Sequence, residues 1–543
     1  MPSYVDNRPL DVIIVGAGFG GCYLLRNLRK QGFRAQIFEE GHGLGGVWWH
    51  NRYPGARVDT DTPYYEFSDP EIWKEWEWAE KYPSQAEMVR YFEFVDQKWD
   101  LSKDVTYGAR VTDATFDPQA NDWTIQTDSG LTATAPFLLL ALGFAAKMYV
   151  PNIKGLDTFK GFSCHTARWP DHHLDLSGKK VGIIGTGATG VQLVQELGPT
   201  AENLVVFQRS PNCAVPMRQK SLALDPPIKT GYPELFSQMK LSRAGFTYPI
   251  INRKAMDDTP EQRRALFEQL WDIGGFAPTQ GNYMDFSTNL EANHEFYYFW
   301  RDKVRQRLLT DDAELIENLA PEEPPYPFGT KRSSLEQNFY EVFNQDNVSL
   351  VSLKKNPIEK VILEGVKMSD GTIHKLDALL LATGFDAVTG SFTRVNIRGL
   401  KGRLLNDVWS RRARTFLGMS TSGFPNMFFL YGPQSPTATA TGPVVSEIQG
   451  DWIIQALVHL RENGYTRIDA QSDVEEQWGH CANDICNGTL LPQNKTSWYM
   501  GGNIPGRTRQ ALSYMGGLPA YRCAINECSS DGFAGFSMQK SVR

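Results

Sequence analysis

The sequence lacks the features that would direct it to nucleic acid or into a membrane. Its 543 residues carry a formal net charge of -7, and lysine and arginine form no basic tract, so a nucleic-acid partner has no electrostatic support. The longest apolar runs, such as 135–146 (APFLLLALGFAA), are shorter than the roughly 18 residues that a membrane span requires. We therefore expect neither nucleic acid nor a membrane among its partners.

Signals for export and a disulfide framework are also missing. No cationic segment precedes the first apolar stretch, no small-residue cleavage site follows it, and the final SVR is not the peroxisomal SKL. The seven cysteines are an odd number scattered along the chain, which argues for reduced thiols. We expect a cytoplasmic monomer. Adjacent histidines, as in 170–176 (PDHHLDL), rarely converge on one metal ion, so we also expect no metal site.

The chain does contain one pattern twice. The first copy, VIIVGAGFGG, places Gly16, Gly18 and Gly21 as GxGxxG between a short apolar strand and a segment with the apolar spacing of a helix. The next apolar strand ends on Glu39, 18 residues beyond Gly21. Such glycines allow a tight turn and let a pyrophosphate approach the helix N-terminus, while the acid holds a ribose hydroxyl. This copy predicts a site for an adenine dinucleotide, which we assign to FAD.

The second copy, VGIIGTGATG, supplies Gly185, Gly187 and Gly190, and the following strand leads to Arg209, 19 residues beyond Gly190. The residue expected at the ribose therefore carries the opposite charge. A carboxylate would repel a 2′-phosphate, whereas a guanidinium forms charge-assisted hydrogen bonds with it. The second copy thus predicts NADPH rather than NADH.

The order of these patterns along the chain predicts the fold class. The segment LDALLLATGFDA (376–387) resembles the late flavin-contact segment of flavoproteins that bind two dinucleotides. We predict an α/β protein with two Rossmann-like dinucleotide-binding domains, in which the FAD domain is discontinuous and the NADPH domain is inserted, together with a helical insertion. The predicted ranges are 1–146 and 381–543 for the FAD domain, 147–220 and 324–380 for the NADPH domain, and 221–323 for the insertion.

Two helix starts have recognisable caps. Ser84 and Glu87 have the spacing of a capping box before a run whose aromatic residues we expect in the core. Thr259, Pro260 and Gln262 have the same kind of arrangement, with proline in the first turn. We therefore expect helices to follow both positions.

A further motif lies between the two nucleotide units. Phe159, Gly161, His165, Trp169 and Pro170 form the pattern FxGxxxHxxxWP. A single histidine in a linker is more often structural than catalytic. We predict that His165 is a hinge or interdomain residue rather than the chemical base.

With this motif, three other segments and both glycine patterns, nearly the whole chain resembles the type I Baeyer-Villiger monooxygenases. The segments are GGVWWHNRYPGARVD (45–59), YPFGTKR (326–332) and SWYMGGNIPG (497–506). The resemblance implies that FAD, reduced by NADPH, reacts with O2 to give a peroxyflavin that converts a ketone to an ester or lactone. It also implies that NADP+ is retained during turnover.

The resemblance assigns roles to individual residues. Arg332 matches the catalytic arginine, and Asp59 matches the acid that positions it. Lys331 matches a contact to the 2′-phosphate of NADPH, and Trp498 matches a tryptophan of a mobile loop near the substrate. Gly442 lies in the stretch 432–446, which we expect near the substrate; its small, polar TATATGP segment departs from the family, so substrate preference transfers poorly.

The predicted cofactor-binding residues are Gly16, Gly18, Gly21, Glu39, Gly46, Val47, Trp48, Asp59, Tyr65, Val111, Gly185, Thr186, Gly187, Thr189, Gly190, Gln192, Arg209, Ser210, Lys331, Arg332 and Asp386.

Three alternative functions remain open at this point. Flavin monooxygenases that oxidise nitrogen or sulfur have a similar FxGxxxH segment but typically lack the Trp-Pro ending. A disulfide reductase would need a cysteine pair at the flavin, whereas the two CxxxxC pairs here, 481–486 and 523–528, lie near the C-terminus. A nucleotide sensor would bind both cofactors without turnover.

Overall fold

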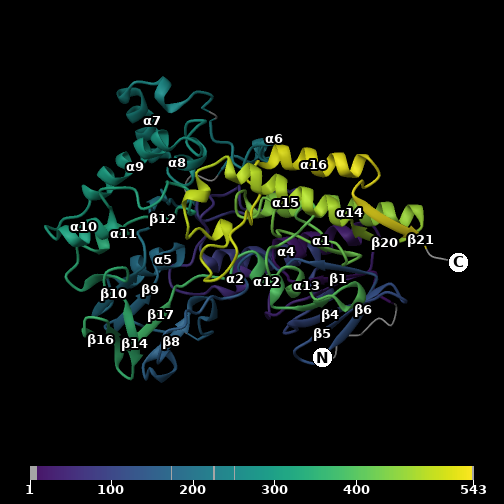
Figure 1. Cartoon of the computed structure of the whole chain (residues 1–543), viewed down its shortest axis with the longest axis horizontal. Coiled ribbons are helices and arrows are strands. Elements are labelled where there is room, and N and C mark those ends of the chain that lie inside the picture. Colours follow the sequence, from purple (N-terminus) through teal and green to yellow (C-terminus); the bar gives the residue numbers. More distant parts are fainter. Residues whose placement is uncertain (1–8, 173, 224–226, 250, 541–543) are drawn as a thin grey trace.

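Two five-stranded parallel sheets form the frame of the protein (Figure 1). The structure is a computed structural model, and it describes residues 9–172, 174–223, 227–249 and 251–540. His173, in the double-histidine stretch, lies outside the described residues. The first sheet has the strand order β19 (Met427–Phe429), β7 (Phe137–Leu140), β1 (Val12–Val15), β2 (Ala35–Phe38) and β3 (Val105–Thr106). The second has the order β13 (Val348–Ser352), β10 (Asn203–Gln208), β9 (Lys180–Ile184), β17 (Ala378–Leu381) and β8 (Phe162–His165).

The central strands of both sheets are short and continuously apolar. The side chains of VIIV in β1 and FLLL in β7 are all buried, as expected for parallel strands covered on both faces. Helix α1 (Phe19–Lys30) follows β1 and packs against α14 (Gly442–Asn463). Helix α5 (Ala188–Leu197) follows β9 in the same way. Each glycine pattern therefore lies between a parallel strand, β1 or β9, and the helix that follows it.

The chain passes between the sheets twice. It leaves the first sheet after β7, builds the second sheet through β17, and returns to add β19 to the first. The predicted α/β class, with the first nucleotide unit interrupted by the second, is confirmed. Strand β17 ends at Leu381, so a division between residues 380 and 381 falls inside that strand.

Smaller sheets and helices surround this frame. The other strands are β4 (Val111–Asp117), β5 (Asp122–Thr127), β6 (Thr132–Ala135) and β18 (Asn396–Arg398) in one sheet; β14 (Ile358–Ile362), β15 (Gly365–Met368) and β16 (Ile373–Lys375) in another; and the pairs β11 (Val215–Pro216) with β12 (Leu335–Glu336) and β20 (Tyr465–Ala470) with β21 (Phe536–Lys540). The other helices are α2 (Val47–His50), α3 (Pro70–Trp73), α4 (Gln85–Trp99), α6 (Tyr232–Leu241), α7 (Pro260–Ile273), α8 (Ala277–Gln280), α9 (Leu290–Arg305), α10 (Ala313–Leu319), α11 (Phe339–Val342), α12 (Thr389–Thr393), α13 (Leu405–Val408), α15 (Ser472–Asn487) and α16 (Leu518–Ser530).

The two predicted helix starts differ in detail. Thr259 caps α7, and its box with Gln262 is complete in both directions, which confirms that prediction. Ser84 caps α4 by accepting from the backbone N–H of Glu87 at 3.3 Å. The Glu87 carboxylate, however, accepts from Ala79 N–H at 2.6 Å instead of returning to Ser84. The predicted return bond from the Glu87 carboxylate to the Ser84 N–H is therefore wrong, because the carboxylate accepts from the Ala79 N–H instead.

The predicted insertion is helical and shares a core with the second sheet. Helices α7 to α10 lie at the upper left of Figure 1, above the second sheet. Phe296 and Trp300 of α9 are fully buried in one cluster with Val181 of β9 and Val206 of β10. Helices α7 to α10 therefore pack as part of the second nucleotide unit, whereas the buried Tyr232, Phe236 and Met239 of α6 belong to the core of the first.

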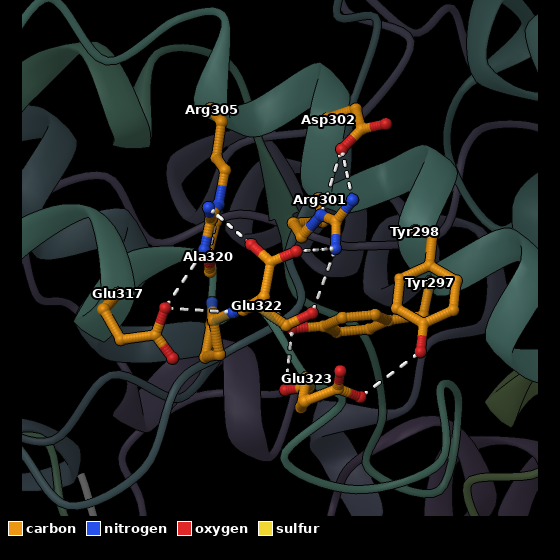
Figure 2. Close-up of polar contacts among 10 residues, drawn as sticks. Tyr297, Tyr298, Arg301, Asp302, Arg305, Glu317, Ala320, Glu322 and Glu323 are labelled. Carbon is orange, nitrogen blue, oxygen red and sulfur yellow. Dashed lines mark hydrogen bonds and ion pairs between the residues drawn. The ribbon is translucent and has the colours of Figure 1, made fainter. Parts of the chain in front are cut away.

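Polar contacts fix the chain where it leaves the insertion. Figure 2 shows α9 side chains reaching the turn at 320–323. Tyr297 donates from its hydroxyl to the Pro321 carbonyl at 2.8 Å, and Arg305 Nε donates to the Ala320 carbonyl at 2.8 Å. Arg301 pairs with Glu322 at 2.8 Å. These contacts set the direction of the segment that next reaches Lys331 and Arg332.

Within the residues that the structure describes, we find no helix both long and apolar enough to cross a bilayer.

A buried ion pair should hold the insertion to the second unit. Arg307 forms two hydrogen bonds, of 2.8 and 2.9 Å, to Glu336 of β12, whose side chain is 1% exposed. Arg307→Met would leave this carboxylate without its main counter-charge, so we expect a loss of about 3–5 kcal/mol of unfolding free energy and a lower thermal midpoint. Lys303→Met, which breaks a more exposed pair with Glu268, is the control and should lose less than about 1 kcal/mol. Equal midpoints for the two variants would contradict this role.

Candidate active site

One cavity of about 1410 Å³ lies between the two nucleotide units. Both glycine loops, the insertion, the TATATG segment and the 497–507 loop contribute to its walls. Most of the residues predicted from the sequence thus meet in one place.

The two glycine loops are built alike. Gly16 and Gly185 have φ values of +101° and +109°, which favour glycine. A Cβ atom on either would lie 2.5 Å from a backbone carbonyl oxygen, that of Ala141 or Ala382. At Gly187 a Cβ atom would meet nothing within 4 Å, so the backbone at the start of α5 faces open space. Each loop therefore fits a pyrophosphate held against a helix N-terminus.

Glu39 lies at the end of β2, beside the first glycine loop. Its carboxylate is 4% exposed and accepts from the backbone N–H groups of Ala17 and Gly41, both at 2.6 Å. The side chain also lines the cavity. This is the position required of an acid that meets the ribose of a dinucleotide.

The second loop faces two cations. Lys331 donates to the Ser210 hydroxyl at 2.8 Å, and the positive charge of Arg209 acts on its ammonium group. Burial, and then the charge of Arg209, lower the pKa of Lys331 to about 8. In the described part of the chain, neither cation forms an ion pair with a carboxylate. This arrangement suits a doubly charged phosphate, so the residues fit NADPH.

Arg332 is held at the centre of the cavity by Asp59. Its Nε and Nη2 atoms donate to the two carboxylate oxygens at 2.7 and 2.8 Å. Nη1 donates to the Ala438 carbonyl at 3.2 Å, and the Phe276 ring lies 4.4 Å from the guanidinium carbon. Three of the five guanidinium N–H groups are therefore used. One N–H group on Nη1 and one on Nη2 are left after these bonds, and the Tyr499 hydroxyl is a further acceptor close to the guanidinium.

The charge on Arg332 is secure. Burial alone would lower the pKa of Arg332, but the charge of Asp59 and the hydrogen bonds to it outweigh burial and raise the pKa. The guanidinium is therefore a permanent cation in a largely enclosed site.

Two tyrosines support the backbone beside Arg332. The Tyr499 hydroxyl donates to the Ala438 carbonyl at 3.3 Å, and the Ala438 N–H donates to the Tyr431 hydroxyl at 2.8 Å. Burial raises the pKa of Tyr431 to about 12 and also raises that of Tyr499. Both hydroxyls therefore stay protonated, and the Ala438 carbonyl receives two donors, one from Arg332 and one from Tyr499.

Most of the other predicted residues line the cavity, and a few do not. Those in the wall are Gly18, Gly46, Val47, Trp48, Tyr65, Val111, Thr186, Thr189, Gln192, Gly442 and Trp498. Gly21 and Gly190 lie behind it, where a Cβ atom would be 1.9 and 2.1 Å from the carbonyl oxygens of Gly16 and Gly185. Asp386 is also outside the wall, and its carboxylate pairs with Lys147 at 3.1 Å and Arg507 at 2.6 Å.

None of the five named residues of the FxGxxxHxxxWP motif lines the cavity wall, although Ala167 and Arg168 within the motif do. His165 Nδ1 accepts from Ala167 N–H at 3.1 Å, so Nε2 carries the proton and donates to the Gly384 carbonyl at 3.0 Å. Burial lowers the pKa of His165. Trp169 is buried, and a Cβ atom on Gly161 would meet the Asp377 carbonyl oxygen at 2.4 Å. Both ring nitrogens of His165 are thus engaged in structural contacts.

Several residues at the site escaped the sequence analysis. Phe276 belongs to the insertion, where no motif marks it. Tyr53 of the first unit contacts the second unit: its hydroxyl donates to Gln192 Oε1 at 2.8 Å and accepts from the Thr189 hydroxyl at 3.3 Å. Tyr53 lies inside the segment 45–59, so its sequence position was a usable signal. Tyr431 and Tyr499 follow an apolar strand and a tryptophan, and neither context predicts a role.

The pKa of Lys331 generates a binding prediction. A bound 2′-phosphate would raise that pKa again, so binding above pH 8 takes up a proton and weakens as pH rises. We expect the affinity for NADP+ to be about tenfold lower at pH 9 than at pH 7, measured by titration calorimetry. NAD+, which lacks the phosphate, and the Lys331→Met variant should have pH-independent affinity over this range. An equal pH dependence for NAD+ would exclude Lys331 as the cause.

Comparison with known proteins agrees with this geometry. Residues 10–223 match a family model described as pyridine nucleotide-disulphide oxidoreductase. The chain is 43% identical to cyclopentanone 1,2-monooxygenase from Comamonas sp. (strain NCIMB 9872), over 98% of this chain and 96% of that protein. It is 38% identical to acetone monooxygenase (methyl acetate-forming) from Gordonia sp. (strain TY-5), over 98% of this chain and 100% of that protein.

A solved structure gives the same result. Cyclohexanone monooxygenase from Rhodococcus sp. Phi1 bound to NADP+ superposes with a TM-score of 0.94 at 35% identity, covering 98% of this chain and 100% of that one. The superposition includes both sheets, the insertion and the residues that line the cavity. The chain belongs to the Baeyer-Villiger monooxygenase family.

Proposed function

We propose that this protein inserts one oxygen atom of O2 beside the carbonyl of a ketone and releases an ester or lactone, using FAD and NADPH. The observation that carries the proposal is the permanently charged Arg332, which lines the cavity that both glycine loops line and has N–H groups beyond those that bind Asp59 and Ala438. Family membership supports the same reaction class.

The cofactors are assigned by the residues that fit them. We propose that the first glycine loop with Glu39 holds FAD, and that the second loop with Arg209 and Lys331 holds NADPH and retains NADP+. When bound, FAD that has been reduced by NADPH activates O2 and supplies the oxygen atom that enters the product. The protein must then provide orientation, electrostatic stabilisation and exclusion of water.

Arg332 supplies the electrostatic part. Negative charge develops on the substrate oxygen as the carbonyl carbon is attacked, and the remaining N–H groups of Arg332 can donate to it. Preorganised donors of this kind are usually the largest single contribution to catalysis. Asp59 fixes the guanidinium through both carboxylate oxygens, so little reorganisation is needed during the reaction.

Aromatic side chains form part of the cavity wall. The Trp498 ring stacks on Phe144 with 5.6 Å between centroids and an 18° interplanar angle. Thr439 and Thr441 line the same cavity and offer hydroxyl groups beside the apolar rings. We propose that this mixed wall orients the ketone.

The reaction can be tested directly on the FAD-loaded protein. We would supply NADPH and ¹⁸O2 with cyclic, linear and aryl ketones, and in parallel with amines and sulfides, and analyse products by mass spectrometry. We expect a ketone to give an ester or lactone that contains one ¹⁸O atom. Oxidation of amines or sulfides alone would instead favour the nitrogen- or sulfur-oxidising alternative. NADPH consumption with hydrogen peroxide as the sole product would overturn the proposal.

Substitutions at the ion pair test the role of Arg332. Arg332→Met should lower ester formation by about 10²–10³-fold, the range for loss of a preorganised donor, while NADPH oxidation continues with release of hydrogen peroxide. Asp59→Asn keeps the cation but loosens it, so we expect a smaller loss in kcat. Product yield per NADPH is the measurement, with FAD content as the control for folding. Ester formation by Arg332→Met at the unmodified rate would remove Arg332 from the reaction.

We also propose the domain ranges given from the sequence, with the division near residue 380 moved to follow Leu381. We propose further that the chain acts as a monomer in the cytoplasm. All seven cysteines are free thiols, in keeping with a reducing compartment. Analytical ultracentrifugation would test the monomer, and a stable dimer at micromolar concentration would contradict it.

A further inference from the structure

The 497–507 loop contributes two groups to the active site. Trp498 lines the cavity and stacks on Phe144, and Tyr499 donates to the same Ala438 carbonyl that accepts from Arg332. A displacement of this loop would therefore open the cavity and remove a donor from the carbonyl that helps to place the guanidinium. The position of the loop matters to the reaction even where the loop does not touch reacting atoms.

Two contacts tie the far end of the loop to one short segment. Asn503 Nδ2 donates to the Phe385 carbonyl at 2.8 Å, and Arg507 Nη2 lies 2.6 Å from Asp386 Oδ1. The side chains of Asp386 and Arg507 are 9% and 21% exposed. The Asp386 carboxylate is buried and the Arg507 guanidinium is partly buried, so removal of one partner costs more than it would at an exposed pair.

The segment that receives the loop lies where the chain passes between the two nucleotide units. It follows β17, and it pairs with the outgoing segment through Tyr149 N–H to the Gly384 carbonyl and Asp386 N–H to the Lys147 carbonyl, both at 2.9 Å. The Gly384 carbonyl also accepts from His165. The loop is thus anchored to the crossing between the units.

We propose that Asp386 is a positioning residue: through its buried ion pair with Arg507 it holds the 497–507 loop over the cavity, and it does not bind a cofactor directly. The sequence predicted Asp386 as a cofactor-binding residue, but its carboxylate is occupied by Arg507 and Lys147 and does not line the cavity. The effect of the loop on catalysis rests on the proposed function, whereas the anchoring itself does not.

The second partner of Asp386 provides a matched control. Lys147 Nζ lies 3.1 Å from the other carboxylate oxygen, but the Lys147 side chain is 42% exposed and belongs to the outgoing segment, not to the loop. Lys147→Gln therefore removes one charge from the same carboxylate without releasing the loop.

Hydrogen exchange measured by mass spectrometry on the FAD-loaded protein tests the anchoring without any ketone. In Arg507→Gln and Asp386→Asn we expect amides of 497–507 to exchange at least about tenfold faster than in the unmodified protein. Lys147→Gln should leave their exchange unchanged, and Arg507→Lys should restore most of the protection. Combining Asp386→Asn with Arg507→Gln should add little to either change alone, because both remove one interaction. Unchanged exchange in Arg507→Gln would overturn the proposal.

Turnover gives a second, independent readout. Loop release should raise the share of NADPH that ends as hydrogen peroxide and lower kcat for the ester by about 10- to 100-fold, with NADP+ affinity retained. A loss of affinity for NADP+ in Asp386→Asn that does not occur in Arg507→Gln would indicate that Asp386 binds the cofactor directly, and it would overturn the positioning role. If no ketone is oxidised while exchange still increases, the proposed function fails and the anchoring stands.

Discussion

The ion pair between Arg332 and Asp59 joins positions 273 residues apart in the sequence, and the arrangement of the site depends on it. Asp59 comes from the first nucleotide unit and Arg332 from the second, so the pair forms only when both units are folded and correctly placed. Burying a guanidinium is unfavourable unless a carboxylate compensates it. The same pair therefore ties the two units together and fixes the cation that we propose acts on the substrate.

Around this pair, both units have the same kind of glycine loop for a dinucleotide, and they differ in the residues that would contact the ribose. The loops at Gly16 and Gly185 have nearly the same φ value and the same approach to a neighbouring carbonyl oxygen. Glu39 accepts backbone N–H groups beside the first loop, whereas Arg209 and Lys331, beside the second, have no carboxylate partner among the residues that the structure describes. The distinction between the two cofactors is therefore one of local charge on a common backbone.

The sequence predicted those parts of the site that depend on local spacing. The glycine loops, the reversal of charge at Arg209 and the pairing of Arg332 with Asp59 follow from patterns within short segments or from the family resemblance. The sequence did not predict contacts between side chains of segments that are distant along the chain and meet only by packing. Phe276 reaches Arg332 from the insertion, where no motif marks it. Asp386 stands after a recognisable strand end, yet its partner Arg507 lies 121 residues further on, so spacing carried no sign of that contact.

The passage between the units consists of two segments of chain that pair with each other around Gly384 and Tyr149. A single covalent connection would let one unit swivel about its bonds in any direction. A paired ribbon resists twisting and bends more readily across its flat face than within its plane. Such a pairing limits the directions in which one unit can rotate against the other, and it includes Asp386, the residue that pairs with Arg507 of the loop.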